Sequence, residues 1–269
     1  RQSHSNLMSA MKYGSLSGGK KIRSSIIMGT GKLFDINNSK LLNLCGAVEC
    51  IHSYSLIHDD LPCMDNDRMR RGKLATHVKF GESTAILAGN SLLTLAFEMI
   101  VDKSYKIESK TKTELIRALA LCSGHTGIAG GQYLDLSFEK KKKKFSDILN
   151  MQRKKTGKLF NFCCFAPGVI AKKKFGDLKS LSKLGEDIGL LFQLADDFID
   201  FSGSKKLAGK STKKDQKKGK STLISLIGYE KANSYALQLK KNILSKLKKH
   251  GKKANNLINT VEFILERNF

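Results

Sequence analysis

Residues 51–65 read IHSYSLIHDDLPCMD and are the most informative stretch of this chain. Apolar side chains recur at helical spacing as far as Asp59 and Asp60, and Pro62 then ends or kinks the predicted helix. Asp59 and Asp65 are six residues apart, so a straight helix would point them about a third of a turn away from each other. Because Pro62 interrupts the helix, we expect Asp65 to come round to the side of Asp59.

A second group of aspartates follows about half a chain later, in residues 192–200, which read FQLADDFID. Asp196 and Asp200 are four residues apart, so on a helix they share one face and can hold an oxygen-liganded cation between them. Either group alone would suit a solvated helix end. Two groups at the ends of apolar helices are unfavourable unless they are paired or bind metal, and together they indicate Mg²⁺ with a diphosphate ligand.

The rest of the chain predicts an all-α protein. Helical periodicity recurs throughout, no alternating strand pattern competes, and only two prolines occur among 269 residues. We expect a single domain over residues 1–269, with an N-terminal segment missing before it. The expected helices span residues 22–34, 39–60 with Ser39 as N-cap, 82–102, 113–124, 145–170, 178–201, 221–247 and 255–265.

Charge is the most unusual property of the composition, because the formal net charge is +24. A field of this sign attracts polyanions such as nucleic acid. However, lysine outnumbers arginine, and runs such as residues 140–144 and 213–218 contain no aromatic side chains, whereas readers of bases favour arginine and aromatic stacking. We interpret the runs as solvated loops and helix faces and expect no nucleic-acid partner; a basic polyanion binder stays the alternative.

Cysteine usage and hydropathy indicate the compartment. The six cysteines form no C-x-x-C pair, and the adjacent Cys163 and Cys164 resemble small apolar fillers of a helix. No run of 18 apolar residues occurs, and the polar start lacks the apolar core of a signal peptide. We therefore expect a soluble cytoplasmic protein without a transmembrane segment.

The same stretches carry a resemblance to a known family. Residues 51–65, followed by RRGK at residues 70–73, resemble its first Asp-rich motif, and residues 192–200 match its second. GGQYLDL at residues 130–136 and KTG at residues 155–157 also stand where the family places them. From about Tyr13 to about Ala232 the chain resembles the trans-prenyltransferases of the isoprenoid synthase fold, most closely the bacterial farnesyl diphosphate synthases.

The resemblance implies a ring of long antiparallel helices around a deep central cavity, with the two Asp-rich motifs facing each other across its mouth. It also implies a Mg²⁺-dependent, head-to-tail condensation of isopentenyl diphosphate with dimethylallyl and geranyl diphosphate, which yields farnesyl diphosphate (C15), and a homodimer. Two alternatives remain open: a geranylgeranyl diphosphate synthase (C20), because residues 63–67 (CMDND) also resemble plastid members, and a non-catalytic subunit with the same fold.

The family's functional residues carry over motif by motif. The resemblance implies Mg²⁺ ligation by Asp59, Asp65, Asp196 and Asp200, supported by Asp60 and Asp197. It implies binding of the allylic diphosphate by Arg70, Lys155 and Lys210, and of isopentenyl diphosphate by Lys20, Arg23, His52 and Arg71. Lys220 is also implied to bind substrate. It further implies stabilisation of an allylic carbocation by Lys155, Thr156 and Gln193.

Chain length and two departures complete the comparison. Tyr54 and Ser55, about one helical turn before the first aspartates, are the residues expected to limit product length, and a bulky Tyr54 resembles the farnesyl pattern. The usual GGKRxRP is GGKKIRS at residues 18–24, which keeps both phosphate ligands but loses the proline. Asn66 and Arg68 replace acidic residues after Asp65, which thins the negative charge there.

Overall fold

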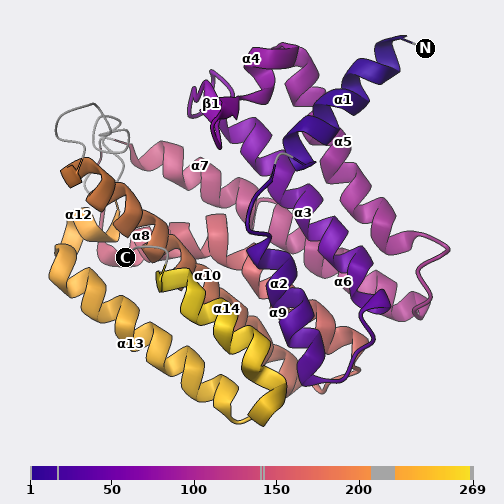
Figure 1. Ribbon diagram of the computed structural model, residues 1–269, viewed down its shortest axis with the longest axis vertical. Coiled ribbons are helices and arrows are strands. Elements are labelled where there is room, and N and C mark those ends of the chain that lie inside the picture. Colours follow the sequence, from indigo (N-terminus) through magenta and orange to yellow (C-terminus); the bar gives the residue numbers. More distant parts are fainter. Residues whose placement is uncertain (1, 17, 140, 142, 207–221, 267–269) are drawn as a thin grey trace. The chain divides into compact units, whose positions relative to one another are not determined.

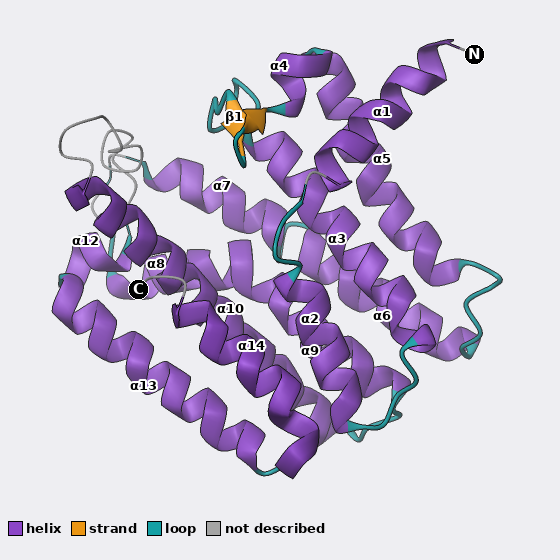
Figure 2. Ribbon diagram, viewed as in Figure 1, coloured by secondary structure: helices purple, strands orange, loops and turns teal. Residues whose placement is uncertain are grey.

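The computed structural model describes residues 2–16, 18–139, 141, 143–206 and 222–266 (Figure 1). Within them the protein is helical apart from one short hairpin, drawn in orange in Figure 2. The helices are α1 (Gln2–Leu16), α2 (Ile22–Leu33), α3 (Ser39–Asp59), α4 (Thr76–Phe80), α5 (Glu82–Val101), α6 (Ser109–Ser123), α7 (Ile128–Phe138), α8 (Phe145–Gln152), η1 (Arg153–Gly157), α9 (Lys158–Ile170), α10 (Phe175–Lys206), α12 (Leu223–Ile227), α13 (Tyr229–Lys248), η2 (Gly251–Ala254) and α14 (Asn255–Glu266), and the hairpin joins β1 (Met69–Arg70) to β2 (Lys73–Leu74).

The described residues gather into two compact units. Unit 1 comprises the residues up to Ser24 and Asn37–Ile116, and unit 2 comprises Ser25–Ile36 and the residues from Arg117 onward. Helices α2 and α6 each have residues in both units. The assignment of the whole chain to a single domain stays a prediction, and the units are described in turn.

The core of unit 1 is the packing of α3 against α5. Two glycines allow these helices to approach closely: a Cβ atom on Gly46 would lie 2.1 Å from Cε of Met99, and one on Gly89 would lie 2.2 Å from Nε2 of His58. The buried face of α3 includes Leu44, Val48 and Ile51, none of which is exposed. Helices α1 and α4 also pack against α5, and α1 packs against α3 as well, so unit 1 is built around the α3–α5 pair.

The start of α3 differs from the prediction. Ser39 was expected as the N-cap, but it is the first helical residue, and Asn38 occupies the cap without a side-chain bond. Oδ1 of Asn37 instead accepts hydrogen bonds from both the backbone N and the Oγ of Ser39, each at 2.9 Å. The expectation was wrong because the side chain of Asn37, one position before the cap residue Asn38, accepts the hydrogen bonds at this helix end.

Helix α5 is the one helix of the described residues that is long and apolar enough to cross a membrane, judged by length and composition alone, with a mean hydropathy of 1.6 over the best window. One such helix is weak evidence, because core helices of globular proteins have the same properties. About a third of the window is buried, including Ala85, Leu92 and Ala96. The absence of a transmembrane segment stays a prediction.

Unit 2 is organised by α9 and α10, which pack together along a seam of glycines. A Cβ atom on Gly185 would lie 2.3 Å from the carbonyl oxygen of Phe160, and one on Gly189 would lie 2.8 Å from Cα of Gly157. Phe160 and Phe162 are completely buried in α9. The seam therefore holds the backbone of α10 against the segment that carries Lys155 and Thr156.

Two predicted helices are interrupted in the structure. The span 145–170 was expected to be one helix, but a turn of π-helix, η1 (Arg153–Gly157), separates α8 from α9. The span 221–247 was also expected to be one helix, but Gly228 has φ 81° and divides it into α12 and α13. Helices α1, α4 and α7 and the β1–β2 hairpin were not predicted at all.

The glycine seam generates a stability prediction. We expect Gly185→Ala to lower the free energy of unfolding by roughly 1–3 kcal/mol, because the added methyl group meets the carbonyl of Phe160. Gly176→Ala is the matched control in the same helix, since its Cβ would meet nothing within 4 Å, and it should stabilise by at most about 1 kcal/mol. Urea unfolding of the two variants checks this; equal stabilities would contradict the close approach of α9 and α10.

Candidate functional site

The first Asp-rich segment lies in unit 1, where α3 ends. The backbone N–H of Asp65 donates to the carbonyl of Asp59 at 2.8 Å, and that of Asp67 donates to the carbonyl of Asp60 at 3.2 Å. Asn66 takes φ 51°, which closes the turn. The backbone therefore turns back from Asp65 to Asp59 after Pro62, and the shared ligand role of the two side chains stays a prediction. Both side chains are part-exposed, whereas Asp60 is buried.

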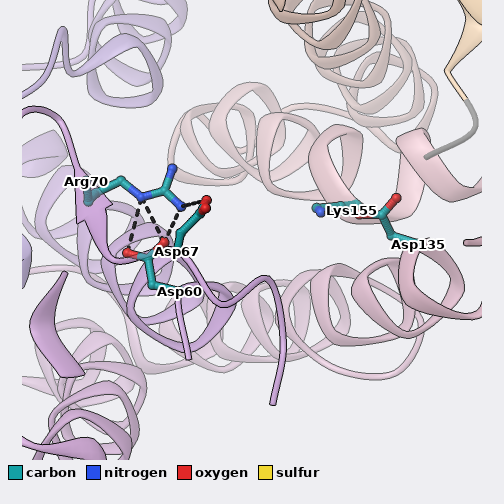
Figure 3. A network of polar contacts seen from close by, with 5 residues as sticks. All are labelled: Asp60, Asp67, Arg70, Asp135 and Lys155. Atoms are coloured by element: carbon teal, nitrogen blue, oxygen red, sulfur yellow. Dashed lines mark hydrogen bonds and ion pairs between the residues drawn. The ribbon is translucent and has the colours of Figure 1, made fainter. Parts of the chain in front are cut away.

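The buried Asp60 is paired with Arg70 from the hairpin (Figure 3). Nε of Arg70 donates to both carboxylate oxygens at 3.0 and 3.2 Å, Nη2 also bonds Oδ1, and Nη2 lies 3.8 Å from Oδ2 of Asp67. Burial raises the pKa of Asp60, and the Arg70 guanidinium opposes that rise. About a third of the Arg70 side chain is exposed, so it stabilises Asp60 and still presents charge to solvent.

Unit 1 also contains a cluster of cations around His52. Desolvation lowers the pKa of His52 well below its usual value, and the charges of Arg23, Arg71, Lys21 and Arg70 lower it further. The imidazole is therefore neutral at physiological pH although basic side chains surround it. The positive charge that helps to keep His52 unprotonated also attracts anions, so this part of unit 1 is suited to bind one.

The glycine turn before α2 holds Arg71 in that cluster. Nη1 of Arg71 bonds the carbonyl oxygen of Gly18, and a Cβ atom on Gly19 would lie 2.7 Å from the same nitrogen. Gly19 has φ 120°, a conformation that a residue with a side chain rarely adopts. The turn thus lets the guanidinium lie against the backbone, and the exposed Lys20 follows it directly.

The two predicted chain-length residues lie on α3. Tyr54 is buried, and its ring contacts that of His58 edge-on at 5.4 Å. Burial, and then the charge of Asp59, raise the pKa of Tyr54. Oγ of Ser55 donates to the carbonyl of His52 at 2.9 Å. Tyr54 is therefore a bulky, buried side chain five residues before Asp59, and its role in setting chain length stays a prediction.

The second Asp-rich segment lies in unit 2, on α10. Asp197 is buried and accepts from Nε2 of Gln193 at 3.0 Å and from Nε2 of Gln152 at 3.1 Å. Oγ1 of Thr156 donates to Oε1 of Gln193 at 2.9 Å. Asp196 and Asp200, one turn apart on the same helix, are more exposed than Asp197. The structure thus joins Thr156, Gln193 and Asp197 in one hydrogen-bonded network.

The π-helix presents Lys155 to the same unit. Nζ of Lys155 lies 2.6 Å from Oδ2 of Asp135 on α7 (Figure 3). A Cβ atom on Gly131 would lie 2.1 Å from the backbone N of Lys155, so only glycine allows α7 to approach η1 this closely. π-Helical turns are frequent at functional sites because they displace side chains from the regular helical positions.

Two residues of these networks were not assigned a role from the sequence. Gln152 is almost fully buried, and its Oε1 has no hydrogen-bond partner among the described residues. Asp135 belongs to the GGQYLDL motif at residues 130–136. Its place in the sequence, three residues before Phe138, did not indicate that it would pair with Lys155. Lys210 and Lys220, both expected to bind diphosphate, lie outside the described residues.

The aspartates suit magnesium by the chemistry of their donor atoms. No three side chains of His, Cys, Asp or Glu converge into a metal site within the described ranges. Mg²⁺ is usually held by one or two carboxylates and completed by substrate phosphates, so a preassembled protein cage is not required. The part-exposed oxygens of Asp59 and Asp65, and of Asp196 and Asp200, supply such donors in each unit.

Comparisons of this sequence with known proteins identify one family. Residues 4–261 match the family model described as polyprenyl synthetase. The chain is 39% identical to farnesyl diphosphate synthase of Escherichia coli (strain K12), covering 97% of this chain and 89% of that protein, and 36% identical to geranylgeranyl pyrophosphate synthase 4 of Arabidopsis thaliana, covering 98% and 71%.

Solved structures agree with these sequence relatives. An FPP/GFPP synthase from Zymomonas mobilis in its apo form is 37% identical with a TM-score of 0.87, covering 96% of this chain and 88% of that one. A geranyltransferase from Helicobacter pylori, complexed with magnesium and isoprenyl diphosphate, is 32% identical with a TM-score of 0.82, covering 97% and 87%.

The neutral His52 predicts a pH dependence of stability. In the unfolded chain His52 gains a proton below pH about 6.5, whereas in the folded protein its lowered pKa keeps it neutral, so acidification from pH 7.5 to 5.5 favours unfolding. The slope from one proton approaches about 1.4 kcal/mol per pH unit. We expect His52→Gln to flatten this part of the urea-unfolding profile.

The exposed His125 supplies the matched control. His125→Gln should leave the wild-type pH dependence unchanged. If His52→Gln retains the full wild-type slope between pH 7.5 and 5.5, then His52 is not held neutral in the folded protein.

Proposed function

The chain belongs to the polyprenyl synthetase family, and we propose that it joins isopentenyl diphosphate head-to-tail to dimethylallyl and then geranyl diphosphate, releasing farnesyl diphosphate. The family, its prenyltransferase chemistry and the predicted all-α isoprenoid synthase fold are confirmed by the relatives and solved structures. A farnesyl product is favoured because bacterial relatives at 36–40% identity carry that name.

One observation carries the proposal: both Asp-rich segments have the same internal design. The middle aspartate, Asp60 or Asp197, is buried and hydrogen-bonded, whereas its outer neighbours are more exposed. The buried carboxylate anchors the segment, and the outer carboxylates present oxygens to a ligand. This division supports Asp59, Asp65, Asp196 and Asp200 as Mg²⁺ ligands, with Asp60 and Asp197 as their supports.

The allylic diphosphate is proposed to bind the outer aspartates through Mg²⁺, together with Arg70, Lys155, Lys210 and Lys220. When bound, Mg²⁺ neutralises the diphosphate and makes it a better leaving group. Arg70 and Lys155 donate charge-assisted hydrogen bonds to its oxygens. Their bonds to Asp60 and Asp135 hold both cations in place before substrate arrives.

Departure of the diphosphate leaves an allylic cation, which Lys155, Thr156 and Gln193 are proposed to stabilise. Thr156 donates to the Gln193 carbonyl oxygen, and Gln193 in turn donates to Asp197. This chain fixes the amide dipole, so no reorientation is needed when positive charge develops. The alkene of isopentenyl diphosphate then attacks the cation to form the new C–C bond, and the resulting cation loses a proton to the released diphosphate, which restores a double bond.

Isopentenyl diphosphate is proposed to bind Lys20, Arg23, His52 and Arg71 without a metal ion. The charges around His52 support this assignment: burial lowers the pKa of His52 most, and Arg23 and Arg71 lower it further because they place positive charge beside the ring. A neutral imidazole still donates one hydrogen bond to a phosphate oxygen. Arginine adds a planar fork that binds two oxygens together.

Geranylgeranyl diphosphate is the second candidate product, because the Arabidopsis relative with 36% identity is a geranylgeranyl pyrophosphate synthase. The bulk of buried Tyr54 favours the shorter product. A homodimer and a cytoplasmic location, without nucleic acid as a partner, complete the proposal. Light scattering of the purified protein tests the dimer.

The first test removes a proposed Mg²⁺ ligand. Asp59→Ala should lower the rate of product formation by at least about 100-fold, because loss of the ligand leaves the departing charge poorly neutralised. Chelation of Mg²⁺ should abolish turnover by the wild type, and added Mg²⁺ should restore it. Asp177→Ala, an exposed aspartate in the first turn of α10, is the control and should keep the wild-type rate. A fully active Asp59→Ala would refute the assignment.

The second test concerns product length. Tyr54→Ala should shift the main product beyond C15, because removing the ring opens space one helical turn before Asp59. Tyr54→Phe keeps the ring and should keep C15, which separates loss of bulk from loss of the hydroxyl. Chromatography of the dephosphorylated products measures both. A C15 product from a folded Tyr54→Ala enzyme would exclude Tyr54 as the limit on chain length.

A further inference from the structure

Helix α13 is held to unit 2 by one face only. Ala236, Ile243 and Leu247 are completely buried, and the ring of Tyr235 contacts Phe145 edge-on at 6.1 Å. Helix α13 packs against α10, α12 and α14 and lies beside α14 in Figure 1. The opposite face is open to solvent and takes no part in the site proposed above.

The open face combines apolar and cationic side chains. A surface groove is lined by Leu237, Lys240, Lys241, Leu244, Ser245 and Lys248. Leu237 is 54% exposed, and the half-buried Leu244 lies seven residues later on the same side of the helix. The result is a second apolar stripe, bordered by lysines, on the side of α13 that does not face the core.

The charge around this stripe is one-sided. Residues 229–253 contain eight lysines and a single acidic residue, Glu230. Lys246 pairs with Asp187 at 3.1 Å, and Lys253 pairs with Asp35. The other six have no ion pair with a carboxylate of the described residues. Such a surface attracts anions, because most of its lysines are not neutralised by carboxylates of the described residues.

The chemistry of the face distinguishes between two kinds of polyanion. Nucleic-acid surfaces favour arginine forks and aromatic platforms on which bases stack. The groove on α13 has neither: its cations are all lysines and its apolar residues are leucines. Exposed leucines flanked by lysines are instead typical of helices that lie in the interface of an anionic bilayer, where the leucines enter the acyl boundary and the lysines meet headgroups.

We propose that the outer face of α13 docks the protein on anionic lipid surfaces, with Leu237 and Leu244 inserted and Lys240, Lys241 and Lys248 at the headgroups. The contact is peripheral and reversible, because two leucines provide little apolar area and each lysine adds a modest, salt-sensitive attraction. It is independent of the synthase site, so the enzyme reaches a lipid surface without using its catalytic cations.

Vesicle co-sedimentation of the full chain tests the proposal. The wild type should bind vesicles of equal parts phosphatidylglycerol and phosphatidylcholine, and should not bind pure phosphatidylcholine. The triple variant Lys240→Glu, Lys241→Glu and Lys248→Glu should weaken binding by at least about tenfold, because charge reversal replaces attraction by repulsion. Leu237→Asn should weaken the binding that remains at high salt, where the lysines are screened.

A charge-matched control separates this face from the overall net charge. Lys110→Glu, Lys174→Glu and Lys179→Glu alter three exposed lysines outside α13 and should leave vesicle binding close to that of the wild type. An equal loss in both triple variants would overturn the proposal in favour of nonspecific attraction. Absence of binding to anionic vesicles would overturn it directly.

A single-stranded oligonucleotide provides the remaining comparison. If the α13 triple variant loses oligonucleotide binding while the wild type ignores anionic vesicles, the face binds nucleic acid and the proposal is wrong. Prenyl transfer from soluble substrates should be unchanged in every variant. Vesicle binding needs no turnover, so its failure and the failure of the proposed synthase activity are separate results.

Discussion

A buried carboxylate lies in the middle of each Asp-rich segment, and keeping it satisfied constrains the residues around it. An ionised side chain away from water is strongly unfavourable unless hydrogen bonds or opposite charge replace its hydration. Asp60 meets this requirement with an arginine, and Asp197 meets it with two glutamine amides. The two solutions give the segments different charge, although in both segments the outer aspartates are more exposed than the buried one.

The partner of each buried carboxylate explains a local piece of structure. Arg70 reaches Asp60 because the β1–β2 hairpin turns at Arg71 and Gly72, both with positive φ, directly after the aspartates. In unit 2, the π-helical turn begins directly after Gln152, which binds Asp197, and it contains Thr156, which binds Gln193. The hairpin and the π-helix are therefore the means by which the chain supports its buried charges, and their irregularity follows from that task.

Sequence patterns predicted the long helices and the aspartate turn, because both depend on short-range rules. Apolar spacing located α3, α5 and α10 to within a few residues, and Pro62 indicated where the backbone reverses. The π-turn was missed because it depends on contacts with distant residues, notably Gly131 beneath Lys155 and Gly189 beside Gly157. Gln152 and Asp135 were missed for the same reason: their partners are distant in sequence.

The excess of positive charge has different consequences at buried and at solvent-exposed positions. In unit 1, burial lowers the pKa of His52, and the charges of Arg23 and Arg71 lower it further, so the imidazole stays neutral. On α13 the lysines are solvated, and each acts weakly in a screened medium. Total charge therefore does not identify a partner by itself. Partner identity follows from what accompanies the charge: arginine forks and a neutral histidine suit a small diphosphate, whereas lysines beside exposed leucines suit a lipid surface.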